Sequence, residues 1–164
     1  MKLLVLAIGG TIDKVYFDAL SDYQIGAPAA VEILQRVRAN FDFEVRQMIS
    51  KDSLEMTDAD RQEILSVVQD HSGKHVIITH GTDTMVDTGQ VLKRAAHKTI
   101  VIMGAMQPAI MKLTDADFNL GVAVAAVQTL SEGVYLCMNG RIYNVDRVVK
   151  NRAEGQFQDL GEGL

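Results

Sequence analysis

Residues 3–12 read LLVLAIGGTI, an unbroken apolar run that ends in two glycines and a threonine. A continuous apolar run, without alternating polar side chains, is typical of a strand buried on both faces, as in a parallel sheet. The two glycines permit a sharp turn at the carboxyl end of that strand. We therefore expect a buried strand over residues 3–8, followed by a turn that presents the hydroxyl group of Thr11.

Four more short apolar runs follow along the chain, at 43–49, 76–79, 99–103 and 134–138. Segments with apolar side chains at helical spacing separate them, at 31–37, 58–71, 91–95 and 118–130. Strands that alternate with helices predict an α/β fold, a three-layer sandwich with a mainly parallel sheet of the Rossmann or flavodoxin kind. The last segment, 151–164, is polar and contains three glycines, so we expect its end to be loose.

Composition narrows the class of protein. The 164 residues suit a single domain, 1–164, and 48% of them are hydrophobic, which is enough for one core. A formal net charge of −5 and scattered basic residues argue against nucleic acid as a partner. No apolar run approaches the length of a membrane span, so we expect no membrane partner and a cytoplasmic location.

Cys137 is the only cysteine, and it lies in an apolar run where a small buried side chain is expected.

Polar groups gather after the expected strands, where open parallel sheets bind their ligands. Thr11 follows the first strand. The motif HGTDTM, residues 80–85, follows the strand at 76–79 and brings two threonine hydroxyl groups and the Asp83 carboxylate to the start of a helix. Backbone N–H groups at a helix start favour bound anions. We expect these two motifs to meet at one edge of the sheet.

Each motif also has a purely structural interpretation. The turn at 9–11 matches neither the dinucleotide fingerprint nor the phosphate-binding loop, so it can be a simple turn. Thr84 and Asp87 have the spacing of a capping box, which explains that pair but leaves Thr82 and Asp83 unexplained. The segment 13–24 carries three aromatic side chains without a helical pattern. We expect it to form a loop that acts as a lid, or one whose aromatic side chains pack against the body.

The two motifs resemble the signatures of bacterial-type L-asparaginases and glutaminase-asparaginases. The resemblance continues through the segments DSLEM at 52–56, GAMQP at 104–108, DFNL at 117–120, MN at 138–139 and VVK at 148–150. These segments follow the family's order along nearly the whole chain. Typical members are about twice as long, so the chain resembles the family's amino-terminal catalytic domain, with the carboxy-terminal domain absent.

The resemblance implies hydrolysis of L-asparagine to L-aspartate and ammonia through a threonine acyl-enzyme. Thr11 resembles the nucleophile, with Tyr23 as the lid tyrosine beside it. Thr82, Asp83 and Lys150 resemble a second catalytic cluster. A threonine hydroxyl is a weak nucleophile and needs a base or a proton relay, which Lys150 can supply. The resemblance implies that Ser53 holds the substrate's α-carboxylate and that Asp83 binds its α-ammonium group. Leu54 stands where periplasmic relatives carry a polar substrate contact, and we expect Glu55 to compensate for it. The further expected substrate contacts are Gly10, Gly81 and Ala105.

The resemblance also implies a homo-oligomer, a dimer or tetramer, and no metal or organic cofactor. His80 is interpreted as a structural member of its motif. Close alternatives are a glutaminase or mixed amidase and, less in keeping with the acidic charge, the amidase half of a tRNA-dependent amidotransferase. From other classes, the chain can be a catalytically weak or inactive amino-acid-binding module, or a Rossmann-like nucleotide binder that lacks a phosphate-binding loop.

Overall fold

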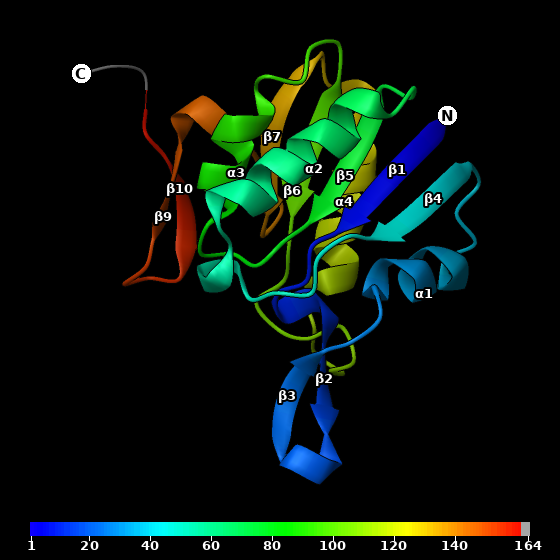
Figure 1. The fold of residues 1–164 in the computed structure, drawn as a ribbon, viewed down its shortest axis with the longest axis vertical. Helices are drawn as coiled ribbons and strands as arrows, with labels where there is room; N and C mark the ends of the chain where they lie inside the picture. Colours follow the sequence, from blue (N-terminus) through cyan, green and yellow to red (C-terminus); the bar gives the residue numbers. More distant parts are fainter. Residues whose placement is uncertain (162–164) are drawn as a thin grey trace.

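A computed structural model describes residues 1–161, and its centre is a six-stranded sheet in the order β4-β1-β5-β6-β7-β8 (Figure 1). Its strands are β1 (Lys2–Ala7), β4 (Asp42–Gln47), β5 (His75–Thr79), β6 (Thr99–Met103), β7 (Gly133–Met138) and β8 (Arg141–Asn144). The first five are mutually parallel and β8 is antiparallel to β7. Every apolar run expected to be a strand is one, and the mainly parallel α/β fold is confirmed.

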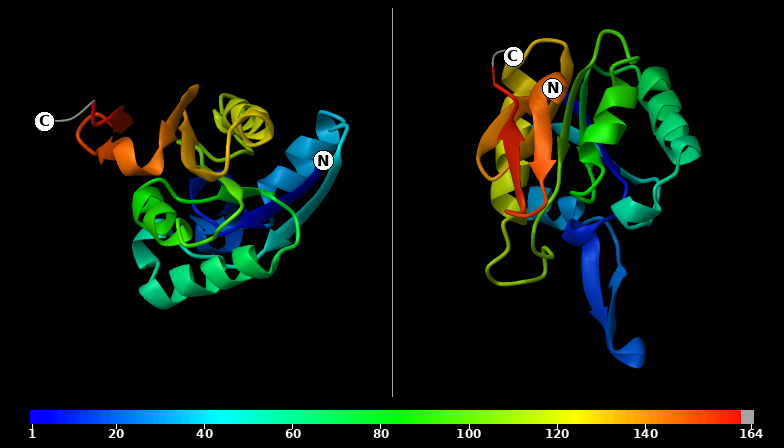
Figure 2. Two further views of the ribbon diagram at one scale, coloured as in Figure 1. Left: turned by 90° about the horizontal axis from the view of Figure 1, so that it is seen from above. Right: turned by 90° about the vertical axis from the view of Figure 1, so that its left-hand side faces the viewer.

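Helices cover both faces of the sheet, which makes three layers (Figure 2). The helices are α1 (Ala29–Arg36), α2 (Asp58–Asp70), α3 (Met85–Leu92) and α4 (Ala116–Thr129). Along β1, Leu4 and Leu6 join the core formed with α2 and α3, whereas Leu3 and Val5 join the core formed with α1 and α4. Both sets of side chains are fully buried, and this explains why the strand shows no polar alternation.

Two helices end earlier than their apolar spacing predicts. Val37 lies just beyond α1 and is exposed, and Ala95 lies beyond the end of α3. In both cases a turn replaces the last expected helical residues. Cys137 on β7 is fully buried, as predicted, and burial raises the pKa of its thiol to about 12.

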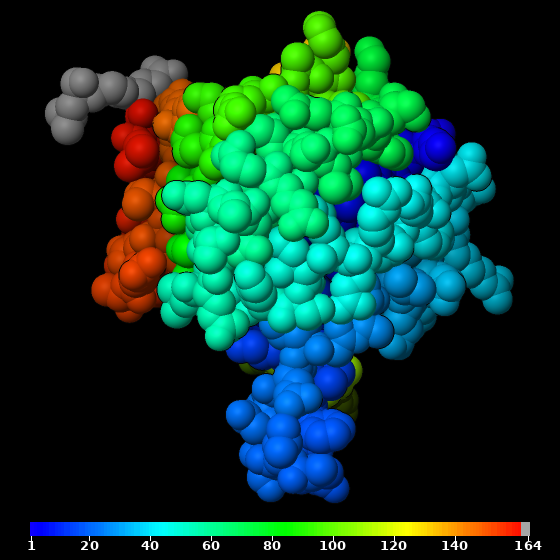
Figure 3. Space-filling view, in the orientation of Figure 1, coloured from blue at the N-terminus to red at the C-terminus, as the bar shows by residue number. Residues whose placement is uncertain are grey.

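A β-hairpin replaces the loop expected at 13–24. Its strands are β2 (Lys14–Phe17) and β3 (Asp22–Ile25), joined by the 3₁₀ turn η2 (Asp18–Leu20). The hairpin stands clear of the body at the lower end of the molecule (Figures 1 and 3). Directly opposite each other across it, Tyr16 and Tyr23 make an edge-to-face contact with ring centroids 5.6 Å apart. Pairing between aromatic side chains therefore gives this segment regular structure.

A second hairpin occupies most of the polar C-terminal segment. Strand β9 (Val148–Asn151) follows the 3₁₀ turn η4 (Val145–Arg147) and pairs with β10 (Gln156–Asp159). Phe157 is buried, and its backbone carbonyl accepts a hydrogen bond from the Tyr143 hydroxyl at 2.8 Å. This contact anchors the hairpin to β8. The expectation for the final residues 162–164 lies outside the described residues.

Across residues 1–161, none of the helices combines the length and the apolar character needed to cross a bilayer.

Candidate functional site

The candidate site lies where the winding of the sheet reverses. The chain moves from β1 outward to β4, then returns to the other side of β1 and builds β5, β6 and β7 in sequence. The carboxyl ends of β1 and β5 are therefore neighbours at a topological switch point, where open α/β sheets bind ligands. The motif with Thr11 follows β1, and the motif with Thr82 and Asp83 follows β5.

Two glycines allow these motifs to touch. Gly10 has φ of 89°, a left-handed conformation that favours glycine, and it precedes the 3₁₀ turn η1 (Thr11–Asp13). A Cβ atom on Gly10 would lie only 2.4 Å from the backbone nitrogen of Gly81. A Cβ atom on Gly81 would lie 2.6 Å from Cβ of Ser53. Close backbone approach thus brings three predicted site segments together, around Gly10, Ser53 and Gly81.

Ser53 is the polar centre of this contact. It is buried at the start of the 3₁₀ turn η3 (Ser53–Glu55), and its Oγ accepts a hydrogen bond from the backbone N–H of Asp83 at 3.3 Å. The Thr84 hydroxyl donates to the backbone carbonyl of Ser53 at 2.8 Å. The expected capping box of Thr84 and Asp87 is therefore wrong: the Thr84 side chain makes no cap hydrogen bond to α3, because its hydroxyl ties two site loops together instead.

Glu55 has a structural role at the same turn. Asp52 and Glu55 form a capping box around η3, in which Oε2 of Glu55 accepts a hydrogen bond from the Asp52 backbone N–H at 3.3 Å. Asp52 also pairs with Lys14, at 3.0 Å, which links η3 to the base of the first hairpin. One carboxylate oxygen of Glu55 is thus already occupied by the backbone.

Lys150 joins the motif after β5 to form a compact polar cluster. Its Nζ lies 2.7 Å from Oγ1 of Thr82 and 2.7 Å from Oδ1 of Asp83. The lysine side chain is only 11% exposed, against 34% for that of Asp83. The three residues come from the loop after β5 and from β9, which are far apart in the sequence. The cluster can orient the Thr82 hydroxyl and move a proton between a hydroxyl and an amine.

His80 is buried and electrically neutral. Its Nδ1 lies 2.7 Å from the carbonyl oxygen of Gly81 and its Nε2 lies 2.8 Å from Oγ1 of Thr88. A carbonyl oxygen only accepts, so Nδ1 carries the proton and Nε2 accepts from the Thr88 hydroxyl. Burial lowers the pKa of His80 to about 4. The ring therefore holds the loop in place without adding charge to the site, as its structural interpretation predicted.

The remaining predicted residues lie at different distances from the cluster. Ala105 is buried directly after β6 and belongs to the core beneath the loop. Tyr23 is 42% exposed on the hairpin and packs against Tyr16. Within residues 1–161, the Tyr23 hydroxyl donates no hydrogen bond to Thr11, Thr82 or Lys150. The described contact of the Tyr23 ring is therefore the one with Tyr16 on the same hairpin.

Asn119 is a residue to which the sequence assigned no role. It is fully buried on α4; its Nδ2 donates to the carbonyl oxygen of Gly104 at 3.0 Å and its Oδ1 accepts from the backbone N–H of Asn139 at 3.0 Å. The side chain therefore fixes the loops after β6 and β7. The DFNL segment at 117–120 was the available signal, but nothing in it indicates which backbone groups the amide reaches.

Among the described residues, no three His, Cys, Asp or Glu side chains gather closely enough to hold a metal ion.

Comparisons of the sequence and the fold with known proteins point to one family. The family model described as "Asparaginase, N-terminal" matches residues 2–158. The probable periplasmic L-asparaginase of Haemophilus influenzae is 30% identical over 91% of this chain and 46% of its own length. The glutaminase-asparaginase of Acinetobacter glutaminasificans is 28% identical over 91% of this chain and 49% of its own length.

A solved structure gives the same result for the fold. The thermostable L-asparaginase from Thermococcus kodakarensis superposes with a TM-score of 0.83 at 30% sequence identity. The superposition covers 97% of this chain and 51% of that one. The chain therefore spans about half the length of the relatives it matches.

Proposed function

The chain belongs to the asparaginase family through that family's N-terminal domain, and on this premise we propose that it hydrolyses L-asparagine to L-aspartate and ammonia. The observation that carries the proposal is the contact of Lys150 Nζ with Thr82 and Asp83, at 2.7 Å each, beside the Gly10 turn. Lysine, threonine and aspartate in mutual contact at a switch point form a proton-relay arrangement that a structural ion pair does not need.

We assign the first chemical step to Thr11. Its Oγ attacks the carbon of the substrate's side-chain amide, and its proton passes to the amide nitrogen, which leaves as ammonia. The resulting aspartyl ester is hydrolysed by water, which releases L-aspartate and restores the threonine hydroxyl. Thr82, Asp83 and Lys150 move the protons, and Tyr23 closes over the site when the hairpin bends toward the body.

Substrate recognition falls to the segments that meet around Ser53. In this proposal the Ser53 hydroxyl donates a hydrogen bond to the α-carboxylate, and the Asp83 carboxylate pairs with the α-ammonium group. Backbone groups of Gly10, Gly81 and Ala105 line the site, and backbone N–H groups there can stabilise the oxyanion of the tetrahedral intermediate. Glu55 contributes through the carboxylate oxygen that does not cap η3.

We further propose that residues 1–164 act as one catalytic domain within a homo-oligomer, a dimer or tetramer, in the cytoplasm. The family relationship supports the assembly in general terms. The location is tested by cell fractionation with an antibody to the protein. Recovery with periplasmic markers, as the name of the probable periplasmic L-asparaginase of H. influenzae suggests for that relative, contradicts a cytoplasmic location.

Ammonia release from the purified protein tests the function. We expect release with millimolar L-asparagine, slower release with L-glutamine, and none above background in Thr11→Ala or Thr82→Ala. Thr129→Ala is the matched control, because Thr129 is exposed on α4 and its hydroxyl bonds to its own helix at 2.9 Å.

The outcomes separate the possible functions. Equal turnover of glutamine makes the protein a mixed amidase. Absence of release from either amide, in protein whose folding is verified by circular dichroism, overturns the proposed activity. In that case binding of labelled L-asparagine without turnover identifies the inactive binding module.

A further inference from the structure

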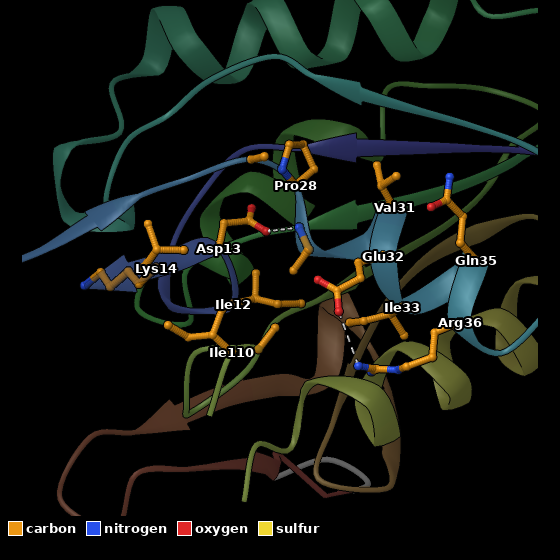
Figure 4. A pocket seen from close by; sticks show the side chains of 14 residues that line it. Ile12, Asp13, Lys14, Pro28, Val31, Glu32, Ile33, Gln35, Arg36 and Ile110 are labelled. Atoms are coloured by element: carbon orange, nitrogen blue, oxygen red, sulfur yellow. Dashed lines mark hydrogen bonds and ion pairs between the residues drawn. The ribbon is translucent and has the colours of Figure 1, made fainter. Parts of the chain in front are cut away.

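A cavity of about 580 Å³ lies beside the turn that carries Thr11, in a different place from the polar cluster (Figure 4). Its walls come from η1 and the start of β2, from α1, and from the loop after β6. In the part of the chain that the structure describes, Thr82, Asp83 and Lys150 do not line it. The proposed hydrolysis therefore makes no use of this space.

One carboxylate faces this cavity with only part of its hydrogen-bonding capacity used. Asp13 is 3% exposed and lines the cavity (Figure 4). Its Oδ1 accepts from the backbone N–H of Ala29 at 2.8 Å, and within residues 1–161 its Oδ2 accepts no hydrogen bond. That second carboxylate oxygen therefore keeps hydrogen-bonding capacity for a bound molecule. Burial raises the pKa of Asp13 to about 6.

The two cations that line the cavity are paired with other acids. Lys14 Nζ lies 3.0 Å from Asp52. Arg36 lies 2.6 Å from Asp117 and 3.6 Å from Glu32. With Asp13, these five groups make a set of six that carries four negative and two positive charges, a net charge of −2. Among residues 1–161 no cation forms an ion pair with Asp13, and a buried charge without a partner is costly.

The rest of the lining is mainly apolar. Ile12 and Ile33 are buried on opposite walls, from η1 and α1, and Ile110 reaches in from the loop after β6 (Figure 4). A ligand that suits this arrangement carries one positive group for Asp13 and a short aliphatic body for the isoleucines. A polar anion fits neither feature.

We propose that this cavity binds a small alkylamine in its protonated form, with the ammonium group on Oδ2 of Asp13 and the alkyl chain against Ile12, Ile33 and Ile110. The ammonium group supplies the missing counter-charge and hydrogen bond. Since the residues of the Lys150 cluster do not line the cavity, amine binding can be tested whether or not the protein hydrolyses asparagine.

Titration calorimetry with n-butylamine hydrochloride at pH 7.5 tests the proposal, with n-butanol as the uncharged probe of similar shape. We expect one butylammonium per chain, bound at least about tenfold more tightly than butanol, because a hydrogen bond to a charged group contributes roughly ten- to a hundredfold. Ammonium chloride is expected to bind more weakly than butylammonium, since it cannot use the apolar wall.

Two variants locate the site. Asp13→Asn keeps an oxygen acceptor for Ala29 and is expected to weaken butylammonium binding about tenfold or more, with butanol unaffected. Ile110→Trp keeps the charge and fills the cavity from an exposed position, and it is expected to weaken both probes. Asp42→Asn, an exposed carboxylate on β4, is the matched control for the change in charge.

The pH dependence gives an independent readout. The amine stays protonated well above neutrality, since such groups titrate at pH ~10.4, whereas the pKa of Asp13 is raised to about 6. Lys14 from β2 and Glu32 and Arg36 from α1 line the same cavity. Affinity is expected to fall as the pH drops from 7.5 to 5. Absence of butylammonium binding, equal affinity for butanol, or unchanged affinity in both Asp13→Asn and Ile110→Trp overturns the proposal.

Discussion

At the scale of single residues, burial shifts the pKa values of two side chains, His80 and Asp13, in opposite directions. The pKa of His80 falls from its usual 6.5 to about 4, and that of Asp13 rises from 3.8 to about 6. Between about pH 4 and 6.5 the unfolded chain takes up a proton at His80 that the folded protein refuses, so acidification destabilises the fold through this residue. The folded protein takes up a proton at Asp13 in nearly the same range, so acidification stabilises it there.

The effects of His80 and Asp13 on stability at acidic pH offset each other. A variant without the Asp13 carboxylate therefore shows the effect of His80 alone. In Asp13→Asn, we expect the free energy of unfolding to fall more steeply than in the wild type as the pH drops from 6.5 to 4, by on the order of 2–3 kcal/mol. Urea unfolding at several pH values measures this difference. If the free energy of unfolding depends on pH in the same way in both proteins, the pKa of Asp13 is not raised in the folded state.

Lys150 is the residue on which the catalytic proposal most depends. Lys150→Met keeps the length of the side chain but removes the amine, so we expect kcat to fall at least about a hundredfold, the usual contribution of a general acid or base. Lys112→Met, at an exposed position, is the control. A steady-state ammonia assay compares them, and a kcat within a few-fold of the wild type in Lys150→Met excludes the amine from the proton relay.

At the scale of elements, the sequence predicts the strands better than the hairpins. Five apolar runs identify five strands. The strands β1, β5, β6 and β7 are largely buried on both faces, whereas the edge strand β4 is only partly buried. The hairpins β2–β3 and β9–β10 are held by few contacts between side chains, such as Tyr16 with Tyr23 and Tyr143 with Phe157. A single buried aromatic leaves no periodic pattern, so β10 could not be separated from a loose tail by pattern alone.

Phe157 links the second hairpin to the site, since it lies opposite Lys150 in the pairing of β9 with β10. Phe157→Ala is expected to cost about 3–5 kcal/mol of unfolding free energy and to lower kcat, because β9 loses its support. Chemical unfolding and the ammonia assay measure the two effects. Loss of stability with unchanged kcat means that β9 keeps Lys150 in place without β10.

The first hairpin is expected to behave in the opposite way. Tyr23→Ala removes an exposed aromatic contact, so the unfolding free energy should change by less than about 1.5 kcal/mol. If the hairpin closes over the substrate, kcat/KM for asparagine falls sharply in the same variant. Tyr16→Ala, which breaks the same ring contact, is the control. If Tyr16→Ala and Tyr23→Ala lower kcat/KM equally, Tyr23 acts only through its contact with Tyr16 and not on the substrate.

At the scale of the whole molecule, fold and site edge follow from the sequence, whereas the contacts within the site do not. The order of strands and helices predicts the three layers and the shared edge of Thr11 and Thr82. Which groups meet there depends on backbone approach, as at Gly10 and Gly81, and on side chains such as Thr84 that leave their local cap. Long-range geometry of this kind has no local signal in the chain.

Exposed apolar side chains argue for assembly. Several are grouped along the loop after β6 and the start of α4: Met106, Ile110, Leu113 and Phe118. Apolar side chains grouped in this way mark interaction surfaces. We expect light scattering coupled to size exclusion to give a multiple of the 18.0 kDa chain mass at micromolar concentration, and Leu113→Asp to lower it. A mass of one chain for the wild-type protein contradicts the proposed oligomer.

The measurement that tests the central claim most directly is the trapping of the covalent intermediate. Wild-type protein is mixed with L-asparagine, quenched in acid during turnover, digested and examined by mass spectrometry. The account predicts an aspartyl ester on Thr11, absent from the Thr11→Ala variant. Turnover of asparagine with an ester on Thr82, or with Thr11 unmodified, contradicts the assignment of the nucleophile to the turn after β1.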